Sequence, residues 1–206
     1  MIRAFLLLPL LTLGGCITLL PDPPAAPRVF VLEAGEVARA EGARIDAVIG
    51  VANPDGERAI LGTDLIWRTG HEIAFVGGTQ WSGRADDLLQ SVLVETLVRQ
   101  GRFAGVSRSG EARTRFDVRW EVHDFEIDAQ SMQARFRADV RIMASPGRRL
   151  IAQEIITAEA PVSDRSASVA AEALARAARE GGARIGMFAA DAAAAELARP
   201  ATAVTD

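Results

Sequence analysis

The chain has 206 residues and a formal net charge of -4 at pH 7, which suits one globular domain with flexible ends. It contains 23 arginines and no lysine, and the acidic balance argues against nucleic acid as a partner, because phosphate backbones are held by clusters of basic side chains. Cys16 is the single cysteine, so an intrachain disulfide and a thiolate metal cluster are both excluded. Packing must therefore stabilise the fold.

The first fifteen residues have the pattern of a bacterial secretory signal. Arg3 precedes an apolar run of ten residues, 4–13, about half the length that a membrane-spanning helix needs. Leu13-Gly14-Gly15-Cys16 then matches the lipobox, where the lipoprotein signal peptidase cuts before a cysteine whose sulfur carries diacylglycerol. We therefore expect residues 1–15 to be removed and Cys16 to be lipidated, rather than an ordinary signal peptide that happens to contain a cysteine.

A tether and then a folded domain are expected after the lipidated cysteine. Residues 16–27 contain four prolines, which remove backbone donors and keep the chain extended. The folded domain is predicted over residues 28–198. It opens with two short apolar segments, 29–32 and 43–52, the second of which ends at turn-forming residues.

A hairpin and an amphipathic helix come next. Segments 64–68 and 72–76 are separated by Thr69-Gly70-His71, a pattern typical of a β-hairpin. From 84 to 100 the apolar residues recur at helical spacing, with two aspartates in the first turn, where the helix dipole favours anions. Gly101 follows as a natural C-cap.

A long antiparallel meander is predicted between residues 114 and 160. Segment 114–127 changes the phase of its alternation near His123-Asp124, which indicates a β-bulge. Segment 132–142 alternates apolar with charged residues, so one face is buried and the other is solvated. Pro146-Gly147 turns the chain into a third strand over 149–158.

The alanine-rich segment 163–198 predicts a final helix that starts near Asp164 and could be split at Gly181-Gly182, where each glycine lowers helix propensity by about 1 kcal/mol. Residues 199–206 are expected to be a disordered tail. The predicted fold class is α+β: an antiparallel β-sheet with two helices packed on one face, preceded by a signal peptide and a proline-rich tether.

Catalytic and metal-binding patterns are not found in the sequence. The two histidines are His71, in the expected hairpin turn, and His123, at the expected bulge; neither GxSxG nor HExxH occurs. We therefore predict no enzyme activity, no catalytic residues, no cofactor and no metal. Trp67 and Trp120 are expected in the core, whereas Trp81 could anchor the hairpin against the start of the first helix.

The strandlike segments also predict a row of exposed arginines. Arg135, Arg137 and Arg141 share the polar face of one strand, and Arg119 falls on a neighbouring strand. A solvated sheet face is the simpler interpretation of this row. The alternative is a docking surface for an acidic partner or for lipid headgroups.

Taken in order, these features resemble a known family. A lipobox and proline tether lead to the strand Val29-Phe30-Val31-Leu32 and then to Leu65-Ile66-Trp67-Arg68. Thr79-Gln80-Trp81-Ser82 precedes a helix that contains Asp86-Asp87-Leu88-Leu89, and a meander leads to an alanine-rich helix. This order resembles the ABC-type transport auxiliary lipoproteins, which accompany the MCE (mammalian cell entry) class of lipid transporters, over roughly residues 27–190. That family often has tyrosines in the first strand, and this chain has none.

The resemblance implies a non-catalytic protein on the periplasmic face of the outer membrane. It would contact an MCE-domain protein that works with a permease and an ATPase to move phospholipid, sterol or another hydrophobic molecule. Ile17, where an aspartate would signal retention in the inner membrane, favours the outer membrane. By analogy with ring-forming partners, the resemblance leaves room for a homo-oligomer.

Two other hypotheses remain open at the level of sequence. The chain could be an envelope-assembly lipoprotein that supports a cell-wall synthase or an outer-membrane complex. It could also carry lipid directly, which would require a cavity lined by apolar residues. Only 5% of its residues are aromatic, and the apolar positions are needed for the core, so lipid carriage ranks lowest.

Overall fold

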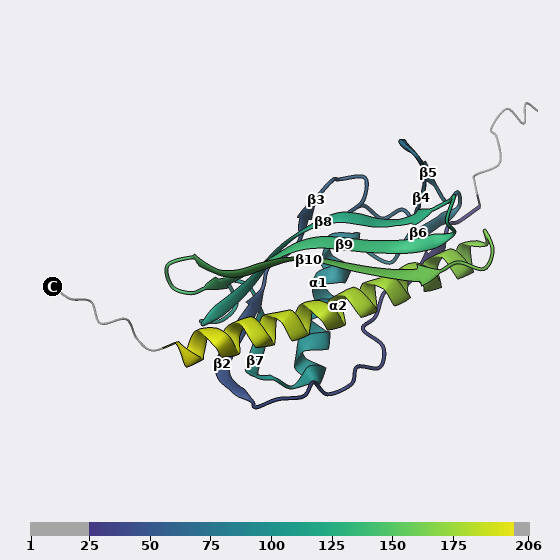
Figure 1. Cartoon of the computed structure of the whole chain (residues 1–206). Coiled ribbons are helices and arrows are strands. Elements are labelled where there is room, and N and C mark those ends of the chain that lie inside the picture. Colours follow the sequence, from purple (N-terminus) through teal and green to yellow (C-terminus); the bar gives the residue numbers. More distant parts are fainter. Residues whose placement is uncertain (1–24, 200–206) are drawn as a thin grey trace, which may run out of the picture.

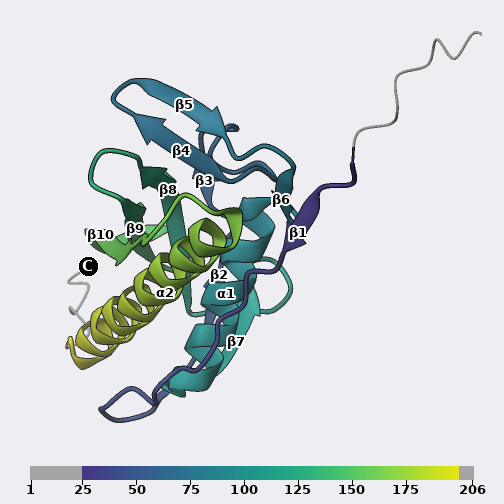
Figure 2. The same cartoon turned by 90° about the vertical axis from the view of Figure 1, so that its right-hand side faces the viewer.

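The computed structural model describes residues 25–199. The predicted signal peptide, the lipidation site Cys16, most of the tether and nearly all of the predicted tail lie outside the described residues. The described chain forms an eight-stranded main sheet with helices α1 (Ala85–Gln100) and α2 (Ala167–Ala198) packed side by side on one face, which confirms the α+β prediction (Figures 1 and 2). Among the described helices, none is long and apolar enough to cross a membrane.

Three long strands form the predicted meander: β8 (Phe116–Asp128), β9 (Gln133–Ala144) and β10 (Arg149–Pro161). Their pairing is antiparallel throughout, and the register shifts between Val122 and Asp124, which confirms the bulge expected at that point. In β9 every second side chain is buried against the helices. The alternation read from the sequence therefore assigned the two faces of this strand correctly.

The opposite edge of β8 pairs with three successive segments of the chain, all parallel to it. β2 (Ile45–Val51) pairs with its beginning, β3 (Asp55–Gly56) with its middle and β4 (Ile66–Thr69) with its end. β4 also pairs with β5 (Glu72–Phe75), which confirms the predicted hairpin.

The sheet is therefore mixed, and the prediction of an antiparallel sheet was correct only for the meander and the hairpin. β7 (Phe103–Arg108), which the sequence analysis did not predict, pairs with β2 in parallel. A parallel partner requires a crossover connection, and α1 lies in that connection between β2 and β7. The sequence pattern predicted the helix, but it did not predict that the two strands joined through this helix run parallel.

A second, two-stranded sheet lies where the described chain enters the domain (Figure 2). β1 (Arg28–Phe30) pairs in parallel with β6 (Thr79–Trp81). Trp81 is buried, and its ring stacks on Phe125 with 5.8 Å between centroids. The tryptophan before α1 therefore joins the entry of the domain to the far end of β8.

The helix predicted over 84–100 is confirmed as α1, which ends at Gly101 with φ 71°, a left-handed conformation that glycine adopts without strain. α2 starts three residues later than Asp164, whose side chain accepts a hydrogen bond from the Ser166 backbone N–H at 2.7 Å. The prediction that Gly181-Gly182 could split α2 was wrong, because the helix runs through both residues without a break.

Close packing explains Gly181 but not Gly182. A Cβ atom on Gly181 would lie 2.2 Å from Cδ1 of Phe136, a core residue of β9, so only a hydrogen fits there. On Gly182 the nearest atoms to a Cβ would be Thr96 Oγ1 at 3.6 Å and Val92 Cγ1 at 3.7 Å, which is ordinary contact with α1. Tertiary packing therefore outweighs the low helix propensity of the pair.

Alanine substitutions at the two glycines should have opposite effects. We expect Gly181→Ala to destabilise the domain by up to about 2 kcal/mol, because overpacking against Phe136 costs roughly 1–3 kcal/mol and offsets the gain in helix propensity of about 1 kcal/mol. Gly182→Ala, the matched control, should stabilise it by up to about 1 kcal/mol. Urea unfolding of both variants measures the difference, and equal effects would contradict the proposed packing.

Candidate functional site

The outer face of the β8–β9–β10 meander, which points away from the helices, carries the predicted row of arginines. Arg135, Arg137 and Arg141 alternate with buried residues of β9, and Arg119 lies between buried residues of β8. All four therefore lie on this face, as the sequence predicts. Their surroundings differ along the strands, so the outer face divides into two halves.

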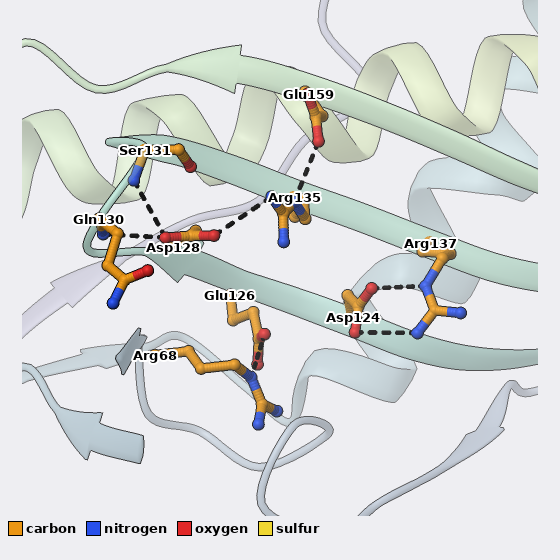
Figure 3. A network of polar contacts seen from close by, with 9 residues as sticks. All are labelled: Arg68, Asp124, Glu126, Asp128, Gln130, Ser131, Arg135, Arg137 and Glu159. Carbon is orange, nitrogen blue, oxygen red and sulfur yellow. Dashed lines mark hydrogen bonds and ion pairs between the residues drawn. The ribbon is translucent and has the colours of Figure 1, made fainter. Parts of the chain in front are cut away.

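The half near the β8–β9 turn is a ladder of paired charges (Figure 3). Arg137 donates to Asp124, with 2.5 Å from its Nε to Oδ2, and this hydrogen bond raises the pKa of the guanidinium. Arg135 bridges Glu159 at 3.0 Å and Asp128 at 3.2 Å. We call the set of Asp124, Asp128, Arg135, Arg137 and Glu159 the paired ladder. Cross-strand neighbours supply these pairs, because Asp124 lies opposite Arg137 and Arg135 lies opposite Glu159.

A buried ion pair extends from the paired ladder to the β4–β5 hairpin. Glu126 of β8 is 2% exposed, and Nε of Arg68 from β4 donates a hydrogen bond to its Oε1 (Figure 3). This hydrogen bond raises the pKa of Arg68. The other carboxylate oxygen of Glu126 is buried without a hydrogen-bond partner among the described residues. Arg68 is therefore the main compensation for the buried charge of Glu126.

The other half of the outer face is basic. Arg119 of β8 lies directly opposite Arg141 of β9, and within the described chain no carboxylate pairs with Arg119. Arg141 has only longer contacts, 3.7 Å to Glu121 and 3.6 Å to Asp139. From the sequence, all four arginines were expected to form one basic row. The carboxylates that neutralise half of them were not predicted, although the acidic residues at alternate positions of β8 were the available signal.

The histidines are placed as expected and are not brought together. His71 lies in the β4–β5 turn and His123 at the bulge of β8, beside Asp124, whose carboxylate is bound by Arg137. Within residues 25–199, no group of three histidine, cysteine, aspartate or glutamate side chains could hold a metal ion.

The tryptophans are placed as follows. Trp120 is buried, and its indole N–H donates to the carbonyl of Ala52 at 2.8 Å, so it belongs to the core, as predicted. Trp67 is only partly buried and packs beneath the guanidinium of Arg165, 5.2 Å from the ring centroid.

Fold and surface together define a small α+β domain with a polar, uncovered sheet face, and the comparisons identify its family. The family model described as "ABC-type transport auxiliary lipoprotein component" matches residues 30–186. The chain therefore belongs to the ABC-type transport auxiliary lipoprotein family. This confirms the family expected from the resemblance, and it makes the chain a lipoprotein-family component associated with ABC-type transport and the cell envelope.

Solved structures share the fold. A Xanthomonas campestris protein of the DUF330 family matches with a TM-score of 0.73 and 19% identity, covering 82% of this chain and 98% of its own. A hypothetical protein from Chlamydia trachomatis matches with a TM-score of 0.52 and 10% identity, covering 73% and 99% of the two chains. At these identities the likeness concerns the fold alone. No curated protein gives a significant match.

Removing Arg68 should expose the cost of the buried carboxylate. We expect Arg68→Met to destabilise the domain by about 2 kcal/mol, below the roughly 3–5 kcal/mol of a fully buried pair because the Arg68 side chain is 31% exposed. The double variant Arg68→Met/Glu126→Leu should recover most of this loss, since no buried charge remains. Denaturant unfolding checks both, and a double variant as unstable as the single one would contradict the assignment.

Asp128 should make stability depend on pH. Hydrogen bonds from the backbone N–H groups of Ser131 and Gln130, together with Arg135, hold the pKa of Asp128 below its usual 3.8. A lowered folded-state pKa stabilises the fold above pH 3.8, and this contribution disappears as the pH falls through the folded-state pKa. The difference in melting temperature between wild type and Asp128→Ala should therefore shrink in acid. Asp46→Ala is the control, because that exposed carboxylate has no side-chain hydrogen bond within the described residues.

Proposed function

We propose that this chain is a non-catalytic accessory of an MCE-type ABC transporter that moves lipids or other hydrophobic molecules across the envelope. The family match over residues 30–186 carries the proposal, because it spans the whole sheet and most of α2. The lipobox at Leu13-Gly14-Gly15-Cys16 supports a lipid anchor with the domain in the periplasm, and Ile17 after the cysteine favours the outer membrane. The MCE-domain protein would reach this domain from the inner membrane, beside its permease and ATPase.

The outer face of the sheet is our proposed docking surface. The helices cover the other face, whereas β8, β9 and β10 expose alternating charges of both signs over three adjacent strands. Such a pattern favours selective protein contact, because a wrong partner would place like charges against each other. Ile155 on β10 is 61% exposed and lies opposite Asp139, so it adds an apolar anchor to this charged surface.

The tether sets how far the domain extends from its membrane. Residues 16–27 span roughly 30–40 Å when extended, at about 3.1 Å per residue. The described chain enters at β1, beside β6 and the far end of β8. The proposed docking surface is thereby held within tens of ångströms of the anchoring membrane and can meet a partner that crosses the periplasm.

Site-specific photocrosslinking tests the docking surface. We expect a photoreactive residue at Ile155, on the outer face, to capture an MCE-domain protein from intact membranes. The same residue at Val98, on α1, is the matched control, because Val98 is 57% exposed but belongs to the helix layer. Captured proteins are identified by mass spectrometry.

The outcomes separate the hypotheses. Capture of an MCE-domain protein at Ile155, weakened by Cys16→Ala, supports both docking and anchoring. Capture of that protein at Val98 alone would move the docking surface to the helices. Capture of wall-synthesis proteins alone would favour the envelope-assembly hypothesis and overturn the transport proposal.

A further inference from the structure

A pocket of about 930 Å³ lies at the basic end of the outer face. Four arginines from four different segments line it: Arg113 before β8, Arg119 on β8, Arg141 on β9 and Arg148 in the β9–β10 turn. Two aspartates, Asp55 and Asp117, also line it, so the pocket has a formal surplus of two positive charges in a protein that is acidic overall. We call it the arginine pocket.

The arginines of this pocket lack the pairing seen elsewhere on the same face. Within residues 25–199, the guanidinium groups of Arg113, Arg119 and Arg148 have no ion pair or hydrogen bond. Arg141 has only the longer ion-pair contacts with Glu121 and Asp139, and its Nε is buried without a hydrogen-bond partner. In the paired ladder, by contrast, each arginine is hydrogen-bonded to a carboxylate. Arg119 and Arg141 also lie directly opposite each other, an arrangement of like charges that destabilises a sheet unless an anion lies between them.

Asp117, one of the two aspartates that line the pocket, forms no ion pair with its arginines within the described residues. Asp117 Oδ1 accepts hydrogen bonds from Thr114 at 3.0 Å and from Ser109 at 3.3 Å, so this oxygen is held away from the arginines by two hydroxyl groups. A Cβ on Gly50 would lie 2.3 Å from the same oxygen, which shows how closely β2 confines it. The positive charge of the pocket is therefore open to a ligand.

We propose that the arginine pocket binds the phosphate group of a phosphate-bearing amphiphile. Guanidinium groups donate paired hydrogen bonds in a planar fork that matches phosphate oxygens. Four such groups around one hollow offer more donors than a single carboxylate can accept, whereas a phosphate monoester presents three acceptor oxygens. Met143 and Leu150 line the same pocket, and Leu150 is 47% exposed, so an apolar part of the ligand has a surface beside the phosphate.

The pocket lies far from the point where the chain enters the domain. β1 enters beside Phe125, whereas the pocket lies beside Asp117 and Arg119, about 20–25 Å away along β8 at roughly 3.3 Å per residue. In Figure 1 the β9–β10 turn lies at the end of the sheet opposite to β6. A phosphate bound in the arginine pocket would therefore lie at the opposite end of the sheet from the point where the chain enters the domain. Phosphate binding there does not require an MCE-domain protein on the outer face.

Binding by the full, lipidated chain in non-ionic detergent tests the proposal. The probes are glycerol phosphate, followed by isothermal titration calorimetry, and dioctanoyl phosphatidic acid, which carries the same phosphate monoester, followed by native mass spectrometry. We expect both to bind, the phospholipid more tightly, and Arg119→Gln/Arg148→Gln to weaken each by about tenfold or more. The control Arg39→Gln/Arg58→Gln removes the same charge from exposed positions elsewhere and should leave binding unchanged.

Each outcome decides the question. Because both targeted arginines lack side-chain partners among the described residues, and Arg119→Gln removes a like-charge pair, the variants should melt at or slightly above the wild-type temperature, and this is checked by circular dichroism. Equal affinity for glycerol phosphate and phosphatidic acid would support the phosphate site but contradict a contribution from the apolar part of the ligand. A glutamate-rich peptide that binds as tightly would overturn phosphate selectivity and favour an acidic protein partner. If the control variant lost as much affinity, the effect would come from net charge alone, and the proposed binding site would be wrong.

Discussion

The pairing of β8 along both of its edges is the constraint on which the rest of the domain depends. β9 follows one edge along its length, while β2, β3 and β4 occupy the other edge in turn. Because each of these segments takes its position from one strand, the hairpin, the crossover helix and the meander are all aligned to β8. The bulge between Val122 and Asp124 lets the strand keep apolar residues toward the helices on both sides of the shift.

Sequence reasoning succeeded where the determinants are local. Alternation in β9, the turn at Pro146-Gly147, the phase change at His123 and the C-cap at Gly101 depend on neighbouring residues, and all were placed correctly. It failed where contacts with segments distant in the sequence determine the local structure. β7 is a strand because β2 offers it a parallel edge, and α2 continues through Gly181 because Phe136 needs the space that a side chain would occupy. Neither neighbour can be read from the local pattern.

The arginines of the outer face also show which features depend on local sequence and which depend on distant segments. The sequence located all four arginines on the outer face, since strand periodicity alone fixes their side. Which of them carries free charge depends on cross-strand register, which places Asp124 opposite Arg137 but Arg141 opposite Arg119. A bulge one residue earlier or later would change every such pair beyond it. The distinction between the paired ladder and the arginine pocket is therefore a property of the fold, not of composition.

Arginine is the only basic residue other than histidine in this chain, and elsewhere in the domain its guanidinium groups stabilise the fold through hydrogen bonds. On α2, Arg176 donates to the carbonyl of Pro161 and Arg184 to that of Thr157, both at 2.7 Å, so guanidinium groups cover the free edge of β10. Arg179 likewise holds the carbonyl of Glu33 beside α2. Where arginine serves the fold in this way, a carbonyl or carboxylate accepts its hydrogen bonds. In the arginine pocket, three of the four arginines have no such acceptor within the described residues and Arg141 has only long contacts. This difference, rather than the number of arginines, marks the pocket as a place for a ligand.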